Sequence, residues 1–196
     1  MVTGLDTFDT DALGLLEDGL RKAMLSASGP ELDAALADLG WADMLAEVPD
    51  LAIPLVFRLL GETGSHASVL NDVLLETIGA EPGGTPPVPY TGGNWVVWSR
   101  TPVDHPTLGG LPLHIVPDGE LMRMGEARKA VGWWLIGSAR AMLALARQHA
   151  LDRVQFGKPI ASFQAVRHRL AETLVAIEGA EATLSLPSSE SPDLTA

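Results

Sequence analysis

Apolar side chains recur every three or four positions through residues 10–80, which predicts a run of helices. One stripe lies before the Gly29-Pro30 break (Ala12, Leu15, Leu16, Leu20 and Met24), and a second lies after it (Leu32, Leu36, Leu39 and Leu45). A further pair of helices is expected between Leu51 and Gly79, separated near residues 61–65. We therefore predict an N-terminal helical domain over residues 1–80.

Residues 81–124 differ in character from the helical region before them. Glycine and proline are frequent in residues 82–93, and two short apolar runs follow, Trp95–Trp98 and Leu113–Val116. These runs predict strands, although they are too few and too short for a substantial sheet. We predict a reduced middle segment with short strands over residues 81–124.

The strongest helical pattern begins at Glu126. Its stripe predicts a helix of about 25 residues, roughly 38 Å long (Val131, Trp134, Leu135, Ser138, Met142, Leu145 and His149). A loop is expected over residues 153–160, because it contains Gly157 and Pro159. A second stripe follows Ser162 (Phe163, Val166, Leu170, Leu174, Ile177, Ala180 and Leu184), so the two helices form an αα-hairpin with a patterned apolar face.

A third helix is expected to begin near the end of the sequence. Ser191, Pro192 and Asp193 supply an N-cap residue, a proline at the first helical position and an acid in the first turn. Two helices cannot bury broad apolar faces on both sides by themselves. We therefore predict an incomplete C-terminal helical-bundle domain over residues 125–196, whose missing surface comes from another chain or from a longer protein.

Composition excludes several classes of protein and of site. The 196 residues include 25 acidic, 13 basic and no cysteine residues, and 46% are apolar. The apolar fraction excludes a disordered chain, and the lack of cysteine excludes disulfides and thiolate metal sites. The acidic balance argues against a nucleic acid or an anionic membrane as partner. With no secretory signal or membrane span in the pattern, a cytoplasmic protein is the default expectation.

Charge is unevenly distributed along the chain. Residues 1–80 contain 14 acidic and three basic residues, whereas residues 121–184 contain nine basic and five acidic ones. A phosphate-bearing ligand would therefore find complementary charge only in the rear segment. His149 and His168 have no acidic partner at ligand spacing, so we predict no metal site.

One rear segment carries a specific motif. Residues 153–160 read RVQFGKPI, and Phe163-Gln164-Ala165 and Leu170-Ala171-Glu172 follow at the start of the second helix. This segment resembles the acyl-CoA dehydrogenase signature RxQFGKPI…FQAVxxxLA, and Gly137 lies where that family commonly has a glycine. The front of the chain resembles the family more weakly, through Leu39-Gly40-Trp41-Ala42.

The resemblance implies a mainly α fold. It consists of an N-terminal helical lobe, a middle β segment, here reduced, and the first two helices of a C-terminal four-helix bundle. It also implies an FAD-dependent oxidoreductase that dehydrogenates an acyl-CoA thioester between its α and β carbons, in fatty acid or steroid side-chain degradation. In that family a carboxylate removes the α-proton while the β-hydride goes to the flavin.

The resemblance also implies a cofactor site shared between subunits, because the family's loop reaches the FAD of a neighbour. Carried over, Arg153 pairs with the FAD diphosphate, Gln155 and Phe156 help line it, and Gln164 contacts the adenine end. A guanidinium suits this task because it is always charged and donates hydrogen bonds in a fork. Each residue also has a plainer interpretation. Arg153 could be a cation at the helix end or one partner of a surface ion pair. The two glutamines could form hydrogen bonds within the loop, and Phe156 could be a packing residue.

No catalytic base is assigned in this chain. The family's usual catalytic glutamate lies beyond Ala196, and residues 83–124 form a middle region shorter than the family's β domain. Some family members carry the base on the first bundle helix instead, at the position of Ala127. Glu126 is one residue away, which is about 100° around a helix, so we do not assign it as the base.

Three hypotheses follow from these features. The first is an acyl-CoA dehydrogenase-like subunit that completes the FAD site of a partner subunit, in a homo- or hetero-oligomer, and is inactive alone. The second is a non-catalytic helical scaffold or interaction module derived from the family. The third is that the sequence is a fragment of a complete dehydrogenase.

Overall fold

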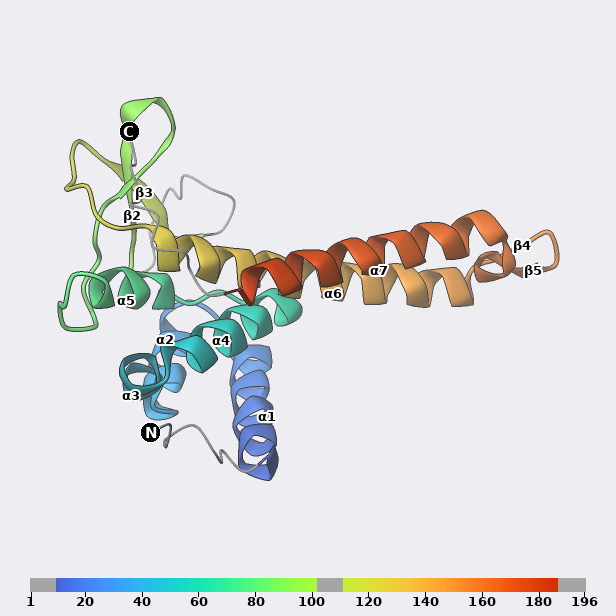
Figure 1. The fold of residues 1–196 in the computed structure, drawn as a ribbon, viewed down its shortest axis with the longest axis horizontal. Coiled ribbons are helices and arrows are strands. Elements are labelled where there is room, and N and C mark those ends of the chain that lie inside the picture. Colours follow the sequence, from blue (N-terminus) through green and yellow to red (C-terminus); the bar gives the residue numbers. More distant parts are fainter. Residues whose placement is uncertain (1–9, 102–110, 187–196) are drawn as a thin grey trace.

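A computed structural model describes residues 10–101 and 111–186. Its helices form a body from which one long hairpin projects as an arm (Figure 1). The body contains α1 (Thr10–Ser26), α2 (Pro30–Asp38), α3 (Trp41–Glu47), α4 (Pro49–Thr63) and α5 (Val69–Glu76). The arm is built from α6 (Gly125–Asp152) and α7 (Gln164–Leu184). The described chain is thus mainly helical, as the sequence predicted.

The strands form two small antiparallel sheets. The first has the order β1-β2-β3, from β1 (Val88–Pro89), β2 (Trp95–Trp98) and β3 (Leu113–Val116), with Trp95 opposite Val116 and Trp98 opposite Leu113. The second joins β4 (Val154–Gln155) to β5 (Lys158–Pro159) at the far end of the arm. The short strands predicted from residues 95–98 and 113–116 are confirmed, while the predicted loop over residues 153–160 contains this two-stranded hairpin.

Proline and glycine residues at the helix ends explain why the helices of the body are short. Pro30 occupies the first turn of α2, where a missing N–H costs nothing. Gly40 separates α2 from α3 with a φ of 82°, and Gly64 ends α4 with a φ of 69°. Both angles lie in the left-handed region, which glycine adopts without a Cβ clash.

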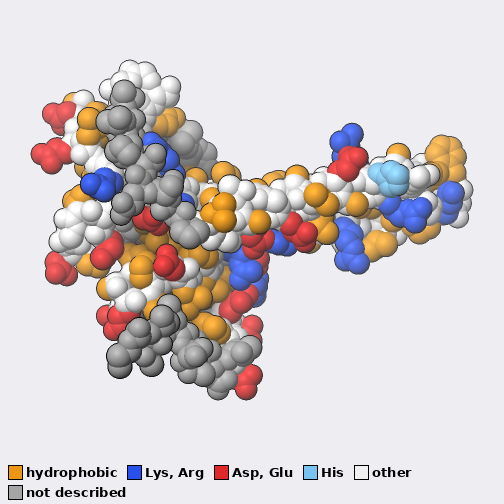
Figure 2. All heavy atoms as spheres, in the orientation of Figure 1, with side chains coloured by type: hydrophobic (Ala, Val, Ile, Leu, Met, Phe, Trp, Pro, Cys, Tyr) orange, Lys and Arg blue, Asp and Glu red, His pale blue; other side chains and the backbone are white. Residues whose placement is uncertain are grey.

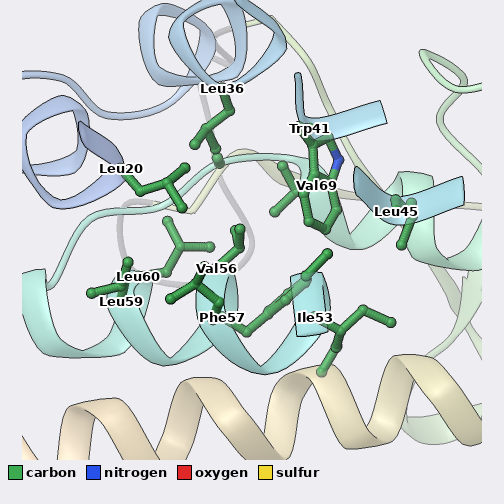
Figure 3. Close-up of a cluster of buried hydrophobic side chains, with 14 of the residues drawn as sticks. Leu20, Leu36, Trp41, Leu45, Ile53, Val56, Phe57, Leu59, Leu60 and Val69 are labelled. Atoms are coloured by element: carbon green, nitrogen blue, oxygen red, sulfur yellow. The ribbon is translucent and has the colours of Figure 1, made fainter. Parts of the chain in front are cut away.

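The core of the body surrounds α4. Val56, Phe57, Leu59 and Leu60 are fully buried, because α4 is enclosed by α1, α3 and α6. Figure 3 shows side chains from α1, α2 and α3 pointing toward this helix, including Leu20, Leu36 and Trp41. Burying a large apolar side chain contributes about 1.5–3 kcal/mol, so the body contains most of the apolar stabilisation of the described chain.

Two glycines bring α4 and α6 into backbone contact. A Cβ on Gly137 would lie 1.9 Å from the carbonyl oxygen of Arg58, and one on Gly61 would lie 2.1 Å from that of Trp134. Neither distance is sterically possible. Only residues without a side chain permit this crossing, which anchors the arm on the body.

The apolar stripe predicted for the first rear helix is mostly exposed, although its Trp134 packs against the core of the body. Val131, Leu135, Met142 and Leu145 are exposed, whereas the buried face carries smaller residues and two large ones (Ala127, Ala130, Trp133, Ile136, Gly137 and Ala150). The reason is that α6 packs on α4 and α7 through small side chains, whose spacing gives a weak hydrophobic pattern. Beyond Ser138, the buried residues of the described arm are Ala150 and Ile177.

Some expectations have no test in the structure. The third helix predicted at residues 191–193 lies outside the described residues. The division into domains at residues 80 and 124 stays a prediction, although the strands do lie between the body helices and the arm. In the described part of the chain, no helix combines the length and apolar character needed to span a bilayer.

Candidate functional site

The four predicted cofactor-binding residues lie together at the tip of the arm. Arg153 follows the last residue of α6, Gln155 is in β4, Phe156 begins the turn and Gln164 starts α7. The tip is held by a backbone hydrogen bond in which the Ile160 N–H donates to the Arg153 carbonyl at 2.8 Å. The fold therefore brings these side chains onto one short segment, about one helix length away from the body.

Arg153 has an exposed side chain that forms no hydrogen bond or ion pair with the described residues. Its backbone N–H caps α6 by donating to the His149 carbonyl at 2.9 Å. Of its two plainer interpretations, an ion pair of Arg153 is absent from the described part of the chain, whereas its position at the C-terminal end of α6 agrees with a helix-terminal cation. The guanidinium keeps all of its donors available for a ligand or a partner.

Phe156 is also unusually placed. Its side chain is 92% exposed, and its φ of 52° is the one positive value among the described residues that are not glycine. The ring meets that of Phe163 edge to face at 6.2 Å, and the Lys158 ammonium lies 4.6 Å from the Phe163 ring centre. A strained backbone that presents an aromatic ring to solvent is a feature typical of a binding segment.

The two glutamines differ in their local contacts. Gln155 has no side-chain hydrogen bond to the described residues, whereas Gln164 Nε2 lies 3.4 Å from His168 Nε2. Both side chains are exposed. Their amide groups can donate and accept hydrogen bonds, which suits the hydroxyl and ring groups of a nucleotide.

A cavity of about 430 Å³ lies at the other end of the arm, between α5, the three-stranded sheet and α6. Nearly all of its walls are apolar, and they include Leu70, Leu74, Val88, Val96, Trp98, Leu113, Val131, Trp134 and Leu135. Its described polar lining consists of Asn71, Tyr90 and Ser138. A largely apolar pocket with a few polar groups is the usual form of a small-molecule site.

Two tryptophans stiffen one side of this cavity. The rings of Trp98 and Trp134 stack with centroids 5.6 Å apart, and Phe57 meets Trp134 edge to face at 6.4 Å. Asn71 Nδ2 donates to the Trp98 carbonyl at 2.9 Å, which fixes strand β2 against α5. Sequence reasoning did not find this cavity, because no motif marks residues that meet only through the tertiary fold.

The tip and the cavity cannot serve one ligand within a single chain. Trp134 and Arg153 are 19 residues apart on one helix and its end, which is about 28 Å at 1.5 Å per residue. The tip and the cavity of one chain are therefore separate regions of the surface.

The structure places neither candidate for a base on the apolar cavity. The Ala127 position is buried, and Glu126 lies on α6 with Lys129 Nζ 3.9 Å from its carboxylate. The described lining of the cavity contains no carboxylate. Across residues 10–101 and 111–186, no group of three or more His, Cys, Asp or Glu residues is placed to hold a metal ion.

The tip residues fit a nucleotide cofactor in their chemistry. A free guanidinium at Arg153 matches a diphosphate, and the ring of Phe156 offers a face or an edge to an aromatic system. The exposed amides of Gln155 and Gln164 add hydrogen-bonding groups on either side. This donor set suits the diphosphate and adenine portions of FAD, the group that the sequence motif implied.

Comparison with known proteins agrees with the motif. The family described as "Acyl-CoA dehydrogenase, C-terminal domain" matches residues 121–185. Acyl-CoA dehydrogenase IpdE2 of Mycobacterium tuberculosis is 48% identical over 50 residues, and that of Mycolicibacterium smegmatis is 44% identical over 63 residues. Benzylmalonyl-CoA dehydrogenase of Aromatoleum aromaticum is 41% identical over 64 residues.

Each of these sequence matches covers only part of this chain and only part of the relative. They cover 26–32% of this chain and 16–20% of the relatives' own lengths. A solved structure, a variant of the Tcur3481-Tcur3483 steroid ACAD, shares the fold more widely. Its TM-score is 0.59 over 89% of this chain and 76% of that chain, at 16% identity. Residues 121–185 thus match the C-terminal domain family of the acyl-CoA dehydrogenases, and the aligned residues span at most about a fifth of the length of these curated relatives.

Proposed function

We propose that this chain is a subunit of an FAD-dependent acyl-CoA dehydrogenase and that its arm tip completes the FAD site of a partner subunit. The observation that carries the proposal is the unpaired Arg153 at the end of a projecting hairpin, about 28 Å from the cavity of its own chain. The family is one of FAD-dependent oxidoreductases, and the matched segment includes the whole tip.

Each tip residue has a defined role in this proposal. Arg153 binds the FAD diphosphate, because a planar guanidinium donates two parallel hydrogen bonds to phosphate oxygens. Gln155 and Phe156 line the cofactor, and Gln164 contacts its adenine end. When bound, FAD supplies the hydride acceptor for α,β-dehydrogenation. The chain has no assigned base, so catalysis requires a carboxylate from elsewhere in the assembly.

The apolar cavity is our candidate for the acyl portion of the substrate. Its apolar walls suit an apolar chain or ring system, and the stacked Trp98 and Trp134 provide a rigid aromatic side. The structural neighbour is a steroid ACAD, which favours a fatty or steroid side-chain thioester as the substrate class. The same neighbour is heteromeric, which is in line with a site built from two subunits.

Flavin content tests the cofactor proposal. The chain is purified alone and after co-expression with the protein of the neighbouring gene, and bound flavin is measured by its visible absorbance. We expect a yellow assembly in at least one preparation. Arg153→Ala should weaken FAD binding about tenfold or more, since a charge-assisted bidentate contact is worth about 1.5–3 kcal/mol.

Arg169→Ala is the matched control for Arg153→Ala. Arg169 lies on the same arm, is 83% exposed and pairs with Glu172 at 3.3 Å, so its loss should leave flavin content unchanged. Equal flavin content in wild-type protein and Arg153→Ala, with intact association, would favour the scaffold alternative. A colourless wild-type chain in both preparations would overturn the proposal.

Ligand binding tests the cavity separately. Val88→Trp fills the cavity from the sheet side, and Ile115→Trp places the same ring on β3 outside the cavity lining. We expect Val88→Trp to abolish the quenching of tryptophan fluorescence by an apolar acyl-CoA, and Ile115→Trp to retain it. Equal quenching by coenzyme A without an acyl group would contradict an acyl site.

A further inference from the structure

Asn71 is the most deeply buried polar side chain in the described wall of the apolar cavity. It lies in α5, is 2% exposed and belongs to the cavity lining. Its Nδ2 donates to the Trp98 carbonyl at 2.9 Å. Because two carbonyl oxygens cannot share a hydrogen bond, this contact fixes which end of the amide is Nδ2 and which is Oδ1.

The Oδ1 atom of Asn71 is left without a partner in this wall. It accepts no hydrogen bond from the described residues, yet it keeps accessible surface. Because Asn71 lines the cavity, that surface is open to the cavity. Buried amide oxygens usually accept at least one hydrogen bond, and leaving one unpaired is costly. The donor must therefore come from a molecule inside the cavity.

The other polar groups of the described lining are hydroxyl groups, not charges. The Ser138 hydroxyl donates its proton to the Trp134 carbonyl at 3.1 Å, so its oxygen is left to accept a hydrogen bond. The Tyr90 hydroxyl forms no hydrogen bond with the described residues and can donate or accept. The described lining contains no acidic or basic side chain. Figure 2 shows Asp and Glu side chains on the outside of the body instead.

These groups restrict the polar part of a ligand by its hydrogen-bonding chemistry. A carbonyl or ether group has no proton to donate to Asn71 Oδ1 or to the Ser138 oxygen. A carboxylate or an ammonium group would be buried without an opposite charge, which is costly. A hydroxyl group donates a hydrogen bond and stays neutral, so it matches this wall.

We propose that the cavity selects an apolar ligand that carries a hydroxyl group, and that Asn71 determines this specificity by accepting the hydroxyl proton at Oδ1. An apolar ligand without a hydroxyl group displaces water from Oδ1 and leaves the oxygen unpaired, so it binds more weakly. Under the proposed function the ligand is the acyl part of a thioester, and the substrate is then a hydroxylated acyl-CoA. That identification rests on the proposed function, whereas the preference for a hydroxyl group does not.

Three naphthalene derivatives of similar size test the preference by isothermal titration calorimetry. The hydroxyl group of 2-naphthol can donate a hydrogen bond, the ether oxygen of 2-methoxynaphthalene can only accept one, and 2-methylnaphthalene can do neither. We expect wild-type protein to bind 2-naphthol about tenfold more tightly than either of the others, because only 2-naphthol pairs with Oδ1. Equal binding of 2-naphthol and either other compound would overturn the proposal. Val88→Trp fills the cavity and should abolish the binding of 2-naphthol; binding that persists would lie elsewhere and would also overturn it.

Substitutions at two asparagines test the role of Asn71 itself. Asn71→Leu removes Oδ1 and should abolish the preference for 2-naphthol over 2-methylnaphthalene, whereas Asn71→Asp keeps an acceptor and should keep the preference. Asn94→Leu is the matched control and should bind both compounds as wild-type protein does. Its Nδ2 also donates to a carbonyl, that of Thr91 at 3.1 Å, but Asn94 is exposed and lies outside the described lining. An unchanged preference in folded Asn71→Leu, or its loss in folded Asn71→Asp, would overturn the role of Asn71.

These measurements are independent of the proposed function, because the probes contain no thioester and their binding needs no flavin. A protein that prefers 2-naphthol but stays colourless in both preparations would contradict the proposed function alone. A flavin-containing assembly without the preference would contradict the specificity of the cavity alone.

Discussion

Gly137 and Gly61 fix how closely α4 and α6 approach. Gly137→Ala places a methyl group against the Arg58 carbonyl, whose position is set by the helix backbone and cannot give way locally. We expect a loss of about 2–3 kcal/mol in the free energy of unfolding, at the upper end of overpacking costs. Urea denaturation followed by circular dichroism measures it.

Gly179→Ala is the control for this prediction. Gly179 lies inside α7, and a Cβ there would meet nothing within 4 Å. The same substitution should therefore stabilise the protein slightly, by about 0.5–1 kcal/mol, through helix propensity. Equal effects at the two positions would show that α4 and α6 do not touch at Gly137.

Asp72 joins three parts of the body through its carboxylate. It accepts hydrogen bonds from Trp41 Nε1 at 3.1 Å, from the Gly83 N–H at 3.0 Å and from Arg100 Nη2 at 2.5 Å. Asp72→Ala should cost about 3 kcal/mol in the free energy of unfolding, because the buried donors lose their acceptor. Thermal denaturation measures the loss, and Asp38→Ala, at an exposed position, should change stability by less than about 0.5 kcal/mol.

At the scale of elements, one ion pair joins the two helices of the arm. Arg140 on α6 bonds Glu181 on α7, and this hydrogen bond raises the pKa of the Arg140 guanidinium above its ordinary value. Nearby, Leu184 packs against Gly132, where a Cβ would lie 2.8 Å from the leucine side chain. These contacts hold α6 and α7 together at the end of the arm nearest the body. The distal half of the arm has fewer buried residues.

A double-mutant cycle at Arg140 and Glu181 tests whether this ion pair stabilises the arm. Both side chains are partly exposed, so the expected coupling is small, about 0.5–1 kcal/mol. Arg140→Met and Glu181→Gln should each lower stability, and their combination should cost less than the sum. Chemical denaturation of the four proteins measures the coupling, and strict additivity would show that the pair contributes nothing.

The elements were largely predictable, and their contacts were not. Helical periodicity, the Gly29-Pro30 break and the strand runs at residues 95–98 and 113–116 are local signals, and the structure contains the elements they predicted. The buried face of α6 was misassigned, because four of its six buried residues are glycine or alanine and the exposed stripe has larger side chains. The tip residues were found through a contiguous motif, whereas the cavity joins residues far apart in the sequence.

At the scale of the whole molecule, stability is unevenly distributed between the body and the arm. The core cluster lies around α4, whereas residues 139–186 contribute only Ala150 and Ile177 to the buried set. Local opening free energy depends on how much apolar surface a segment buries. The distal arm should therefore open far more often than α4 while remaining helical on average.

Hydrogen–deuterium exchange tests this difference. Amides of α4 should exchange slowly, because they open only when the body unfolds. Amides of residues 140–150 should exchange much faster, because this segment buries little apolar surface. Protection of residues 140–150 equal to that of α4 would contradict this distribution of stability.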